Sequence, residues 1–348
     1  MSVLALRELG PAVGPLASAW DAYVRRHPAG TFYHLVGWRR VIERAFHHLP
    51  HYLYAERDGA VVGVVPLFSA GKRPFARALV SVPLGVGGGV LADDPEAALL
   101  LRQGARAVAE REQLAYVEYK SEKKVFDDLP TKDDLYFGFN QELFPDRERQ
   151  QGVIPRKTRA VLREAERARL SYDFNRVDVE PLWDLYALSL RNLGTPMFPK
   201  ELFVACLEEF PRECDILTVR ENGRILGAVM SFYFEQVMLP FFAGTLPEAR
   251  DVGINNFVYW VMLETGYARG YRRFDFGRSK KETGAFKFKE HFGMKPVPLE
   301  YQYDLVSVSE VPNVNPTNPK YKKAIETWQR LPVPLTKLVG PFLSRRLP

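Results

Sequence analysis

Basic and aromatic residues alternate within residues 274–293, whose sequence is FDFGRSKKETGAFKFKEHFG. Lys287 and Lys289 stand among three phenylalanines, an interleaving that a solvated loop does not require. An ammonium group held against aromatic side chains is less screened than in water, so it attracts an anion more strongly. The pattern predicts a site for an anionic substrate, with Lys289 as the candidate cation.

The elements around this stretch place its polar residues at the end of a strand. Residues 274–276 are expected to form a short strand that stops at Gly277, followed by a short helix through Lys289 and Phe292. Binding sites in open α/β sheets lie outside the carboxyl ends of strands. We therefore expect substrate contacts from residues after the strand and on the helix, namely Arg278, Ser279, Lys287 and Phe288.

A basic helix is predicted upstream, in residues 154–170, IPRKTRAVLREAERARL. Its arginines recur at helical spacing, and like charges four residues apart cost roughly a few tenths of a kcal/mol per pair. Glu164 and Glu166 offset part of this cost. Two interpretations stay open: a solvated basic helix, or a phosphate-binding face at the domain junction, for which arginine is well suited. The residues concerned are Arg156, Lys157, Arg159 and Arg163.

Two glycine-containing loops are further candidates for anion binding. In GTLPEARDVGINNF, Arg250 and Gly253 lead into a helix expected to begin near Ile254, and backbone amides at a helix start attract anions. The run Gly87, Gly88, Gly89 would allow a ligand to approach the backbone closely. An ordinary helix cap also explains the first loop, and a tight irregular turn is the leading interpretation of the glycine run.

The order of elements is repeated along the chain. Residues 51–68 and 215–234 each form an apolar strand, an Asp-Gly or Asn-Gly turn and a second strand, a pattern typical of β-hairpins. Each hairpin is followed by a helical pattern, at 97–108 and at 254–265, and then by a short strand with an acid between apolar neighbours. These similarities predict a tandem duplication of mixed α/β units.

The length of 348 residues suits two domains of roughly 150 residues. Acidic, proline-containing chain gives way to the basic helix near residue 150, so we expect a first domain at 1–150 and a second at 151–308. Residues 309–348 are expected to form a tail with a helix at about 321–330. This tail either packs back on the body or touches an anionic membrane surface, and packing is favoured because its prolines break any long amphipathic helix.

Composition excludes several classes of protein. The two cysteines, Cys206 and Cys214, indicate inert buried thiols in a reducing compartment, and no apolar run is long enough to span a membrane. We therefore expect a cytoplasmic protein, and its net charge of +6 favours anionic partners. His47, His48 and His51 lack partners at metal-ligand spacing and are predicted to lie in a surface turn, so no metal is expected. Motifs of serine hydrolases and P-loop ATPases are absent.

The duplicated unit that ends in FKFKEHFG resembles the FemABX family, aminoacyltransferases built from two domains of the GNAT acyltransferase fold. PRKTRAVLREAE, RNLGTPMFPKELF and NPKYKKAIETWQRLPVPLTKLVGPFL extend the similarity to FemAB-like proteins associated with exosortase/PEP-CTERM systems. The resemblance implies acyl or aminoacyl transfer to an amine of a cell-envelope or exopolysaccharide precursor, peptidoglycan included. It also implies a lipid-linked or small anionic acceptor, with contact at the inner face of the membrane.

The resemblance implies a co-substrate, acyl-CoA or aminoacyl-tRNA, and no tightly bound cofactor. The GNAT pyrophosphate loop Q/R-x-x-G-x-G/A corresponds here to Arg250-Asp-Val-Gly253-Ile-Asn255, with asparagine in the last place. No long inserted helical pair marks a tRNA-binding arm, so the donor stays open between the two.

When an amine attacks an ester or thioester, negative charge builds on the carbonyl oxygen, and Lys289 is the candidate to stabilise it. Asp275 is either the base that removes the amine proton or a buried structural carboxylate, and the substrate itself could also supply the base. A second hypothesis is a catalytically inactive module that binds an anionic glycan or lipid precursor in basic grooves. Detection of an amide product separates the two.

Overall fold

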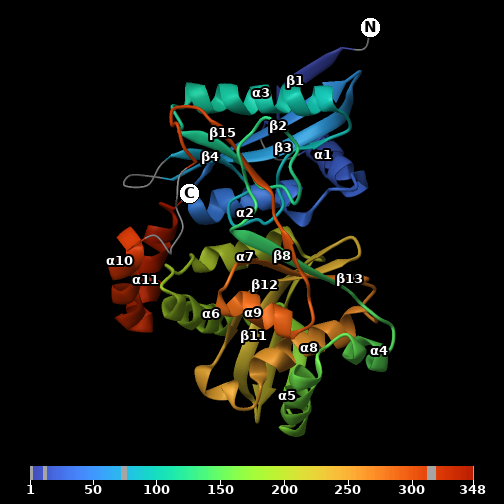
Figure 1. Ribbon diagram of the computed structural model, residues 1–348, viewed down its shortest axis with the longest axis vertical. Helices are drawn as coiled ribbons and strands as arrows, with labels where there is room; N and C mark the ends of the chain where they lie inside the picture. Colours follow the sequence, from blue (N-terminus) through green and yellow to red (C-terminus); the bar gives the residue numbers. More distant parts are fainter. Residues whose placement is uncertain (1–2, 11–13, 72–76, 312–318, 348) are drawn as a thin grey trace. The chain divides into compact units, whose positions relative to one another are not determined.

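The computed structural model describes residues 3–10, 14–71, 77–311 and 319–347, with the side chains of 319–321 left out (Figure 1). The chain forms two compact units, each a mixed sheet with helices on both faces. Unit 1 comprises residues 1–134, 299–318 and 341–348, and unit 2 comprises 135–298 and 319–340.

The sheet of unit 1 has the strand order β1-β2-β3-β4-β6-β15-β7, and β5 pairs with β3. Its strands are β1 (Leu4–Glu8), β2 (Leu49–Arg57), β3 (Ala60–Ala70), β4 (Ala78–Ser81), β5 (Leu91–Ala92), β6 (Tyr116–Tyr119), β7 (Thr131–Lys132) and β15 (Tyr301–Leu305). Its helices are α1 (Pro15–Arg26), η1 (Phe32–His34), α2 (Val36–Phe46) and α3 (Pro95–Arg111).

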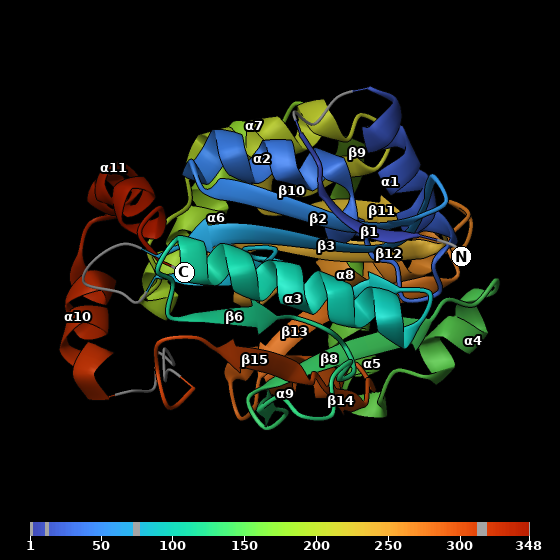
Figure 2. The same ribbon diagram turned by 90° about the horizontal axis from the view of Figure 1, so that it is seen from above.

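Alternation along the central hairpin of unit 1 gives each face of the sheet its own core. Leu53 and Leu67 face α3, which lies across β2 and β3 in Figures 1 and 2. Tyr52 points to the opposite face, where its ring lies 5.0 Å from that of Trp20 on α1. This period of two is what a strand buried on both faces produces.

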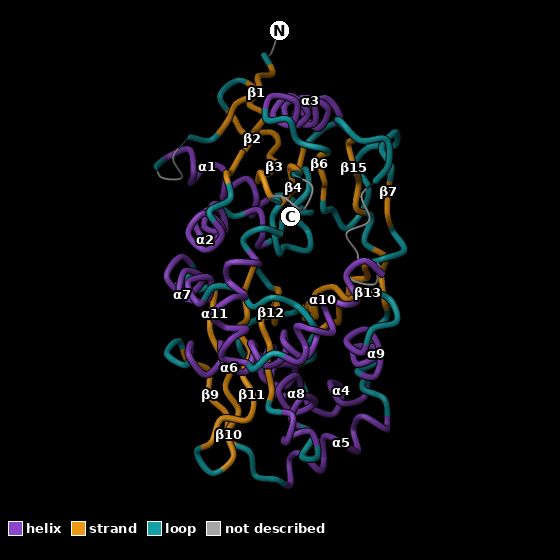
Figure 3. Tube along the Cα trace, turned by 90° about the vertical axis from the view of Figure 1, so that its left-hand side faces the viewer, coloured by secondary structure: helices purple, strands orange, loops and turns teal. Residues whose placement is uncertain are grey.

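The sheet of unit 2 has the order β14-β8-β13-β12-β11-β10-β9. Its strands are β8 (Tyr136–Glu142), β9 (Ser171–Asn175), β10 (Cys214–Glu221), β11 (Arg224–Phe234), β12 (Val237–Thr245), β13 (Arg273–Lys280) and β14 (Pro296–Pro298); Figure 3 shows β9 to β12 in orange. Its helices are α4 (Arg147–Gly152), α5 (Arg156–Arg167), α6 (Val179–Leu193), α7 (Lys200–Glu209), η2 (Pro247–Arg250), α8 (Ile254–Gly266), α9 (Gly284–His291), α10 (Pro319–Arg330) and α11 (Val333–Ser344), although the last turn of α11 is grouped with unit 1.

Two different cores cover the faces of this second sheet. Leu217 and Val229 pack with residues of α5, α8 and α9 in one apolar cluster. On the other face an aromatic cluster joins α6 and α7 to the sheet, with the ring of Phe242 4.8 Å from Phe203 and 5.5 Å from Tyr186. At Gly244 a Cβ would come within 2.4 Å of the Leu185 backbone, so glycine allows α6 to approach β12.

The structure confirms the predicted duplication of a mixed α/β unit. Both hairpins turn through two residues with positive φ, Asp58-Gly59 and Asn222-Gly223, as a type I′ turn requires. Both have a register shift just before the turn, at Ala55/Glu56 and Val219/Arg220. In each sheet the hairpin leads to a pair of parallel strands, β4 with β6 and β12 with β13, with a long helix between them in sequence.

The two units exchange a strand. After β7 the chain leaves unit 1 and enters unit 2 as β8, which pairs with β13 and β14. After β14 it returns to unit 1 as β15, which pairs with β6 and β7. The division falls between residues 134 and 135, 298 and 299, 318 and 319, and 340 and 341, whereas boundaries near 150 and 308 were expected. Sheet pairing, rather than the change in composition, sets the boundaries.

The tail forms two helices. Helix α10 packs on α6, where Gly194 lies against Ile325 and Arg191 donates to the carbonyl of Gln329 at 3.0 Å (Figures 1 and 2). The prolines do keep the helices of the tail short, because α10 ends at Arg330, before Pro332, and α11 has 12 residues; Pro341, however, lies inside α11 and does not end it. Pro334 lies in the first turn, where no intrahelical donor is needed, and Pro341 lies near the end. Within the described residues, no helix is long and apolar enough to cross a membrane.

Candidate active site

The candidate site of unit 2 is built around an irregularity in β13. The strand was expected to stop at Gly277, but it continues to Lys280 because Arg278, Ser279 and Lys280 pair with β8. Between Asp275 and Arg278 the register shifts, and Gly277 has φ 67°, which glycine adopts without strain. The Asp275 carboxylate accepts a hydrogen bond from the Gly277 amide at 2.8 Å and so stabilises this bulge.

Lys289 is buried and reaches the same bulge from α9. Its Nζ donates to the carbonyl oxygens of Gly277 at 3.1 Å and Arg278 at 3.0 Å. Burial lowers the pKa of Lys289 to about 7; the charge of Asp275 opposes this shift and that of Arg278 adds to it. The side chain therefore changes its protonation state near neutral pH, whereas an exposed lysine stays protonated there.

The aromatic walls around Lys289 differ from those expected from the sequence. Its Nζ lies 5.3 Å from the centre of the Phe139 ring and 5.9 Å from that of Phe276. Phe288 and Phe292, the expected walls, instead pack against Tyr259 of α8 at 5.5 and 6.3 Å. These two residues lie on the face of α9 that turns towards α8, whereas Lys289 turns towards the sheet.

The other residues predicted around the bulge differ in exposure: Arg278 is half-buried, Lys287 is exposed and Ser279 is buried. The Arg278 guanidinium lies 4.4 Å from the centre of the Tyr136 ring, and Lys287 is exposed. Ser279 is buried, and its Oγ has no hydrogen-bond partner within the described part of the chain. Burial also lowers the pKa of Lys280 to about 8, and the charge of Arg278 adds to this shift. Sequence patterns gave no signal for this second perturbed amine.

Next to the bulge, the parallel strands β12 and β13 separate. In the described chain their ladder consists of Val237–Arg273 and Met238–Phe274 alone, although β12 continues to Thr245 and β13 to Lys280. Beyond Met238 the edge of β12 that faces β13 therefore lacks ladder partners from β13. Such an edge can accept an extended ligand that carries amide groups.

The loop before α8 provides the residues predicted to bind the donor. Arg250 is exposed at the end of η2, and Gly253 has φ 68°. A Cβ at Gly253 would lie 2.9 Å from Val161 of α5, so this glycine is needed for close helix packing as well as for its conformation. The Asn255 side-chain oxygen accepts a hydrogen bond from Thr245 at 2.8 Å. The loop is thus connected to the end of β12.

The basic helix α5 packs on α8 through Thr158, Leu162 and Ala165, while Arg156, Lys157 and Arg163 are exposed and Arg159 is half-buried. The Thr158 hydroxyl, bonded to the carbonyl of His291 at 2.5 Å, connects α5 to the end of α9. The structure thus brings the start of α5 and the helix of Lys289 together. In the sequence, the contact between α5 and α9 is marked only by Thr158, a polar residue on the apolar side of α5.

The glycine run of unit 1 is enclosed by its own chain. Gly87, Gly88 and Gly89 are buried, and His34 interacts with the Gly89 carbonyl at 3.0 Å. Burial lowers the pKa of His34 to about 4, so its imidazole is neutral at physiological pH. A Cβ at Gly89 would lie 1.9 Å from the Ser121 Oγ. These contacts favour the tight-turn interpretation of the run.

The prediction of a surface turn holds for His47, which is exposed with φ 57° at the end of α2, but was wrong for His48 and His51. His48 and His51 are buried, and His51 lies on β2 between Glu112 at 2.9 Å and Glu8 at 3.3 Å. Its partners come from α3 and β1, which no local pattern links to it. Among the described residues no group of potential ligands could hold a metal ion. Cys206 and Cys214 are buried and unpaired, as expected.

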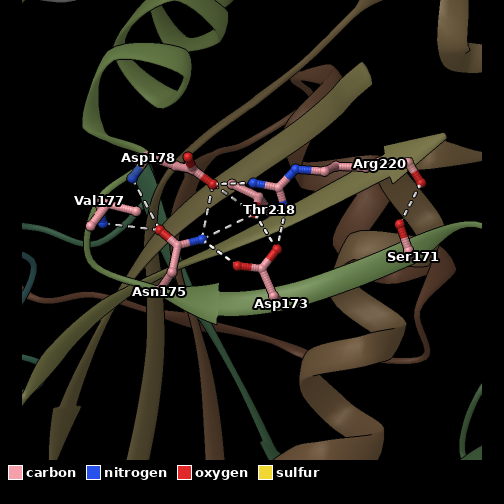
Figure 4. A network of polar contacts seen from close by, with 7 residues as sticks. All are labelled: Ser171, Asp173, Asn175, Val177, Asp178, Thr218 and Arg220. Carbon is pink, nitrogen blue, oxygen red and sulfur yellow. Dashed lines mark hydrogen bonds and ion pairs between the residues drawn. The ribbon is translucent and has the colours of Figure 1, made fainter. Parts of the chain in front are cut away.

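A second polar cluster of unit 2 connects β9, β10 and the start of α6 (Figure 4). Arg220 forms ion pairs with Asp173 and Asp178, and Asn175 accepts hydrogen bonds from the amides of Val177 and Asp178, both at 3.0 Å. Thr218 donates to Asp173 at 3.0 Å. Because these groups satisfy one another, the cluster stabilises the edge of the sheet and is not a candidate site.

Comparison with known proteins agrees with this geometry. Residues 149–290 match the acetyltransferase (GNAT) domain family. That segment contains α5, the β12–β13 opening and Lys289. No curated protein sequence matches the chain.

Solved structures share the duplicated fold. FemX has a TM-score of 0.64 at 13% identity, over 90% of this chain and 99% of that one. A tandem GNAT protein from the clavulanic acid biosynthesis pathway has a TM-score of 0.54 at 13% identity, over 88% and 100%. The C-terminal domain of a putative lysylphosphatidylglycerol synthetase from Agrobacterium fabrum has a TM-score of 0.57 at 12% identity, over 89% and 94%. The chain therefore has a tandem GNAT-like fold.

Proposed function

We propose that this protein is an N-acyltransferase that joins an acyl or aminoacyl group to an amine of an anionic cell-envelope or exopolysaccharide precursor. The observation that carries the proposal is the opening between β12 and β13, with Lys289 at the adjacent bulge, inside the segment that matches the GNAT domain family. The FemABX resemblance supports the class of acceptor.

Acyl-CoA is the donor that the opening supports best. Its pantetheine arm is extended and carries two amide groups, so it can pair with the β12 edge beyond Met238 as an added strand would. The pyrophosphate would then lie towards the start of α8, where Arg250 is exposed and Gly253 precedes the first helical amides. Aminoacyl-tRNA is the second candidate donor, and it rests on the FemABX resemblance alone.

In the proposed reaction the acceptor amine attacks the acyl carbonyl, a C–N bond forms, and the C–S bond of the thioester breaks. In the tetrahedral intermediate between these two events the carbonyl oxygen carries negative charge, and the Lys289 ammonium is proposed to donate a hydrogen bond to it. The amine proton must leave; Asp275 is a candidate base, although its carboxylate already accepts from the Gly277 amide. The released thiolate takes up a proton, so the step consumes no other reactant.

The acceptor is proposed to bind along the exposed basic side of α5. Arg156, Lys157 and Arg163 have no ion-pair partner within the described part of the chain, so their charges are available to a phosphate. Lys287 of α9 is also exposed, and the Thr158–His291 hydrogen bond ties its helix to the start of α5.

The decisive experiment incubates the purified protein with a panel of acyl-CoA thioesters or aminoacyl-tRNAs and amine-bearing precursors, and searches for an amide product by mass spectrometry. Free thiol released in proportion to amide supports acyl-CoA as the donor. Binding of a precursor without any amide product from either donor class would instead support the catalytically inactive binding module.

A further inference from the structure

Helix α11 has an inverted amphipathic pattern. Its inward face consists of small or polar residues, with Thr336 at 1% exposure, Gly340 buried and Ser344 at 4%. Its outward face is apolar: Leu335 is 41% exposed, Leu338 76%, Val339 36% and Phe342 58%. These four residues follow the i, i+3, i+4, i+7 spacing of one helical face. The chain thus exposes the side of α11 that a soluble helix normally buries.

The inward face of α11 is firmly attached, so the exposed face is not a consequence of a detached helix. A Cβ at Gly340 would lie 2.5 Å from the Met197 amide nitrogen, which shows how closely α11 approaches the chain after α6. Lys337 forms an ion pair with Asp184, and its Nζ lies 4.2 Å from the centre of the Trp183 ring. The apolar face is therefore presented in a fixed orientation.

Basic residues predominate in the tail that contains this face, although Lys337 pairs with Asp184 and Arg345 donates to the carbonyl of Ala45. Between 319 and 348 the sequence has one acid, Glu326, and seven basic residues: Lys320, Lys322, Lys323, Arg330, Lys337, Arg345 and Arg346. Lys322, Lys323 and Arg330 are exposed, and the Arg346 guanidinium lies 4.5 Å from the centre of the Phe342 ring. Apolar side chains beside cationic ones match the boundary between acyl chains and anionic headgroups.

We propose that α11 is a membrane-docking helix, which lies in the plane of an anionic bilayer surface with Leu335, Leu338, Val339 and Phe342 inserted. Its 12 residues are too few to span a bilayer, which needs about 20. A second copy of this chain would bring two tails of the same positive charge together, and their repulsion disfavours a dimer through this face. An anionic lipid surface satisfies both the apolar and the basic side chains.

The test uses the full-length protein and flotation with vesicles made of equal parts phosphatidylcholine and phosphatidylglycerol, or of phosphatidylcholine alone. Wild type should bind the anionic vesicles, and salt should weaken this binding. Leu338→Glu and Phe342→Glu should each bind at least about tenfold more weakly, because each adds a charge to the inserted face. Leu99→Glu is the matched control, since Leu99 is 49% exposed on α3, and it should bind as wild type does.

Any of three results would overturn the proposal. The first is equal vesicle binding by wild type and both α11 variants, and the second is no binding by wild type. The third is a wild-type dimer, seen by sedimentation equilibrium, that Leu338→Glu dissociates; that result would make the face a contact between copies. Circular dichroism verifies that each variant keeps its helices, so a loss of binding is not a loss of folding.

Discussion

Replacing Lys289 with methionine should destabilise unit 2 without unfolding it. Methionine keeps most of the apolar stem, but the carbonyls of Gly277 and Arg278 lose the donor that bonds them at 3.1 and 3.0 Å. A buried polar group left without a partner costs about 1 to 3 kcal/mol, so the two together set an upper limit of about 6 kcal/mol. Removal of the buried amine offsets part of this cost, because burial lowers the pKa of Lys289 to about 7 and the charged amine is therefore unfavourable in the folded protein.

This offset in the free energy of unfolding depends on pH, and the direction of the pKa shift fixes its sign. The ordinary pKa of lysine is 10.5, so between pH 7 and 10.5 the unfolded chain binds a proton that the folded chain releases. The contribution of Lys289 to the free energy of unfolding therefore rises with pH across this window. Between pH 6.5 and 9.5 the rise should be about 3 kcal/mol, at about 1.4 kcal/mol per pKa unit.

Urea denaturation of wild type and Lys289→Met at both pH values measures this effect, because the difference between the proteins cancels other titrating groups. Methionine should appear more destabilising at pH 9.5 than at pH 6.5. Lys287→Met is the control, since Lys287 is exposed on the same helix and should change stability little at either pH. A wild-type–mutant difference that does not vary with pH would refute the buried, pKa-shifted lysine.

The same variant tests the catalytic role. If the ammonium stabilises the oxyanion, single-turnover rates should fall on the order of 100-fold in Lys289→Met, and wild-type rates should fall above about pH 7 as the amine loses its proton. A residue that only positions the bulge would lower the rate without that pH dependence. A folded variant with a rate within a few-fold of wild type would transfer the role to Lys287, Arg278 or the substrate.

Three further predictions follow from the fold and the basic helix. Changing Arg159 and Arg163 to alanine should weaken acceptor binding and reduce its salt dependence in calorimetric titrations; unchanged affinity at low salt would mean that the arginines are only solvated. Gly253→Ala should lower the free energy of unfolding by about 1 to 2 kcal/mol, because it adds a Cβ at φ 68° and 2.9 Å from Val161, and Val161→Ala should recover the steric part alone. A fragment of residues 1–134 should unfold at lower urea concentration than the same fragment carrying residues 299–308 on a linker, because β15 pairs with β6 and β7; equal midpoints would contradict the strand exchange.

Local patterns were sufficient for the hairpins and the main helices. Asn222-Gly223 fixes a turn whatever surrounds it, and the periodic apolar residues of α8 define a helix without reference to the sheet. The strand exchange has no such local signal. Tyr136–Glu142 lies in the acidic chain expected between the domains, and nothing in it specifies that it forms a strand whose partner, β13, begins 131 residues later, at Arg273. Pairing across that distance is a property of the whole sheet.

The candidate site shows the same limit at the level of single residues. The sequence places Lys289 on a helix among aromatics, yet its acceptors exist only because β13 shifts register between Asp275 and Arg278. Helical spacing also does not predict which neighbour each side chain contacts. Phe288 packs on Tyr259, whereas the Lys289 ammonium lies against the ring of Phe139. Likewise His51 was expected in a surface turn because no nearby residue indicates its partners. Glu112 and Glu8 reach it from distant parts of the chain, at the end of α3 and in β1.

The two repeats differ at the parallel strands, and this difference favours the second repeat as the place for the proposed donor. In unit 1, β4 ends at Ser81, and the chain then folds beside the end of β6, with the Gly88 amide donating to the Lys120 carbonyl at 2.9 Å. In unit 2, β12 runs on to Thr245 after its ladder with β13 has stopped. The place that unit 1 fills with its own backbone is a strand edge in unit 2, so an extended amide ligand can pair in the second repeat, where Lys289 also lies.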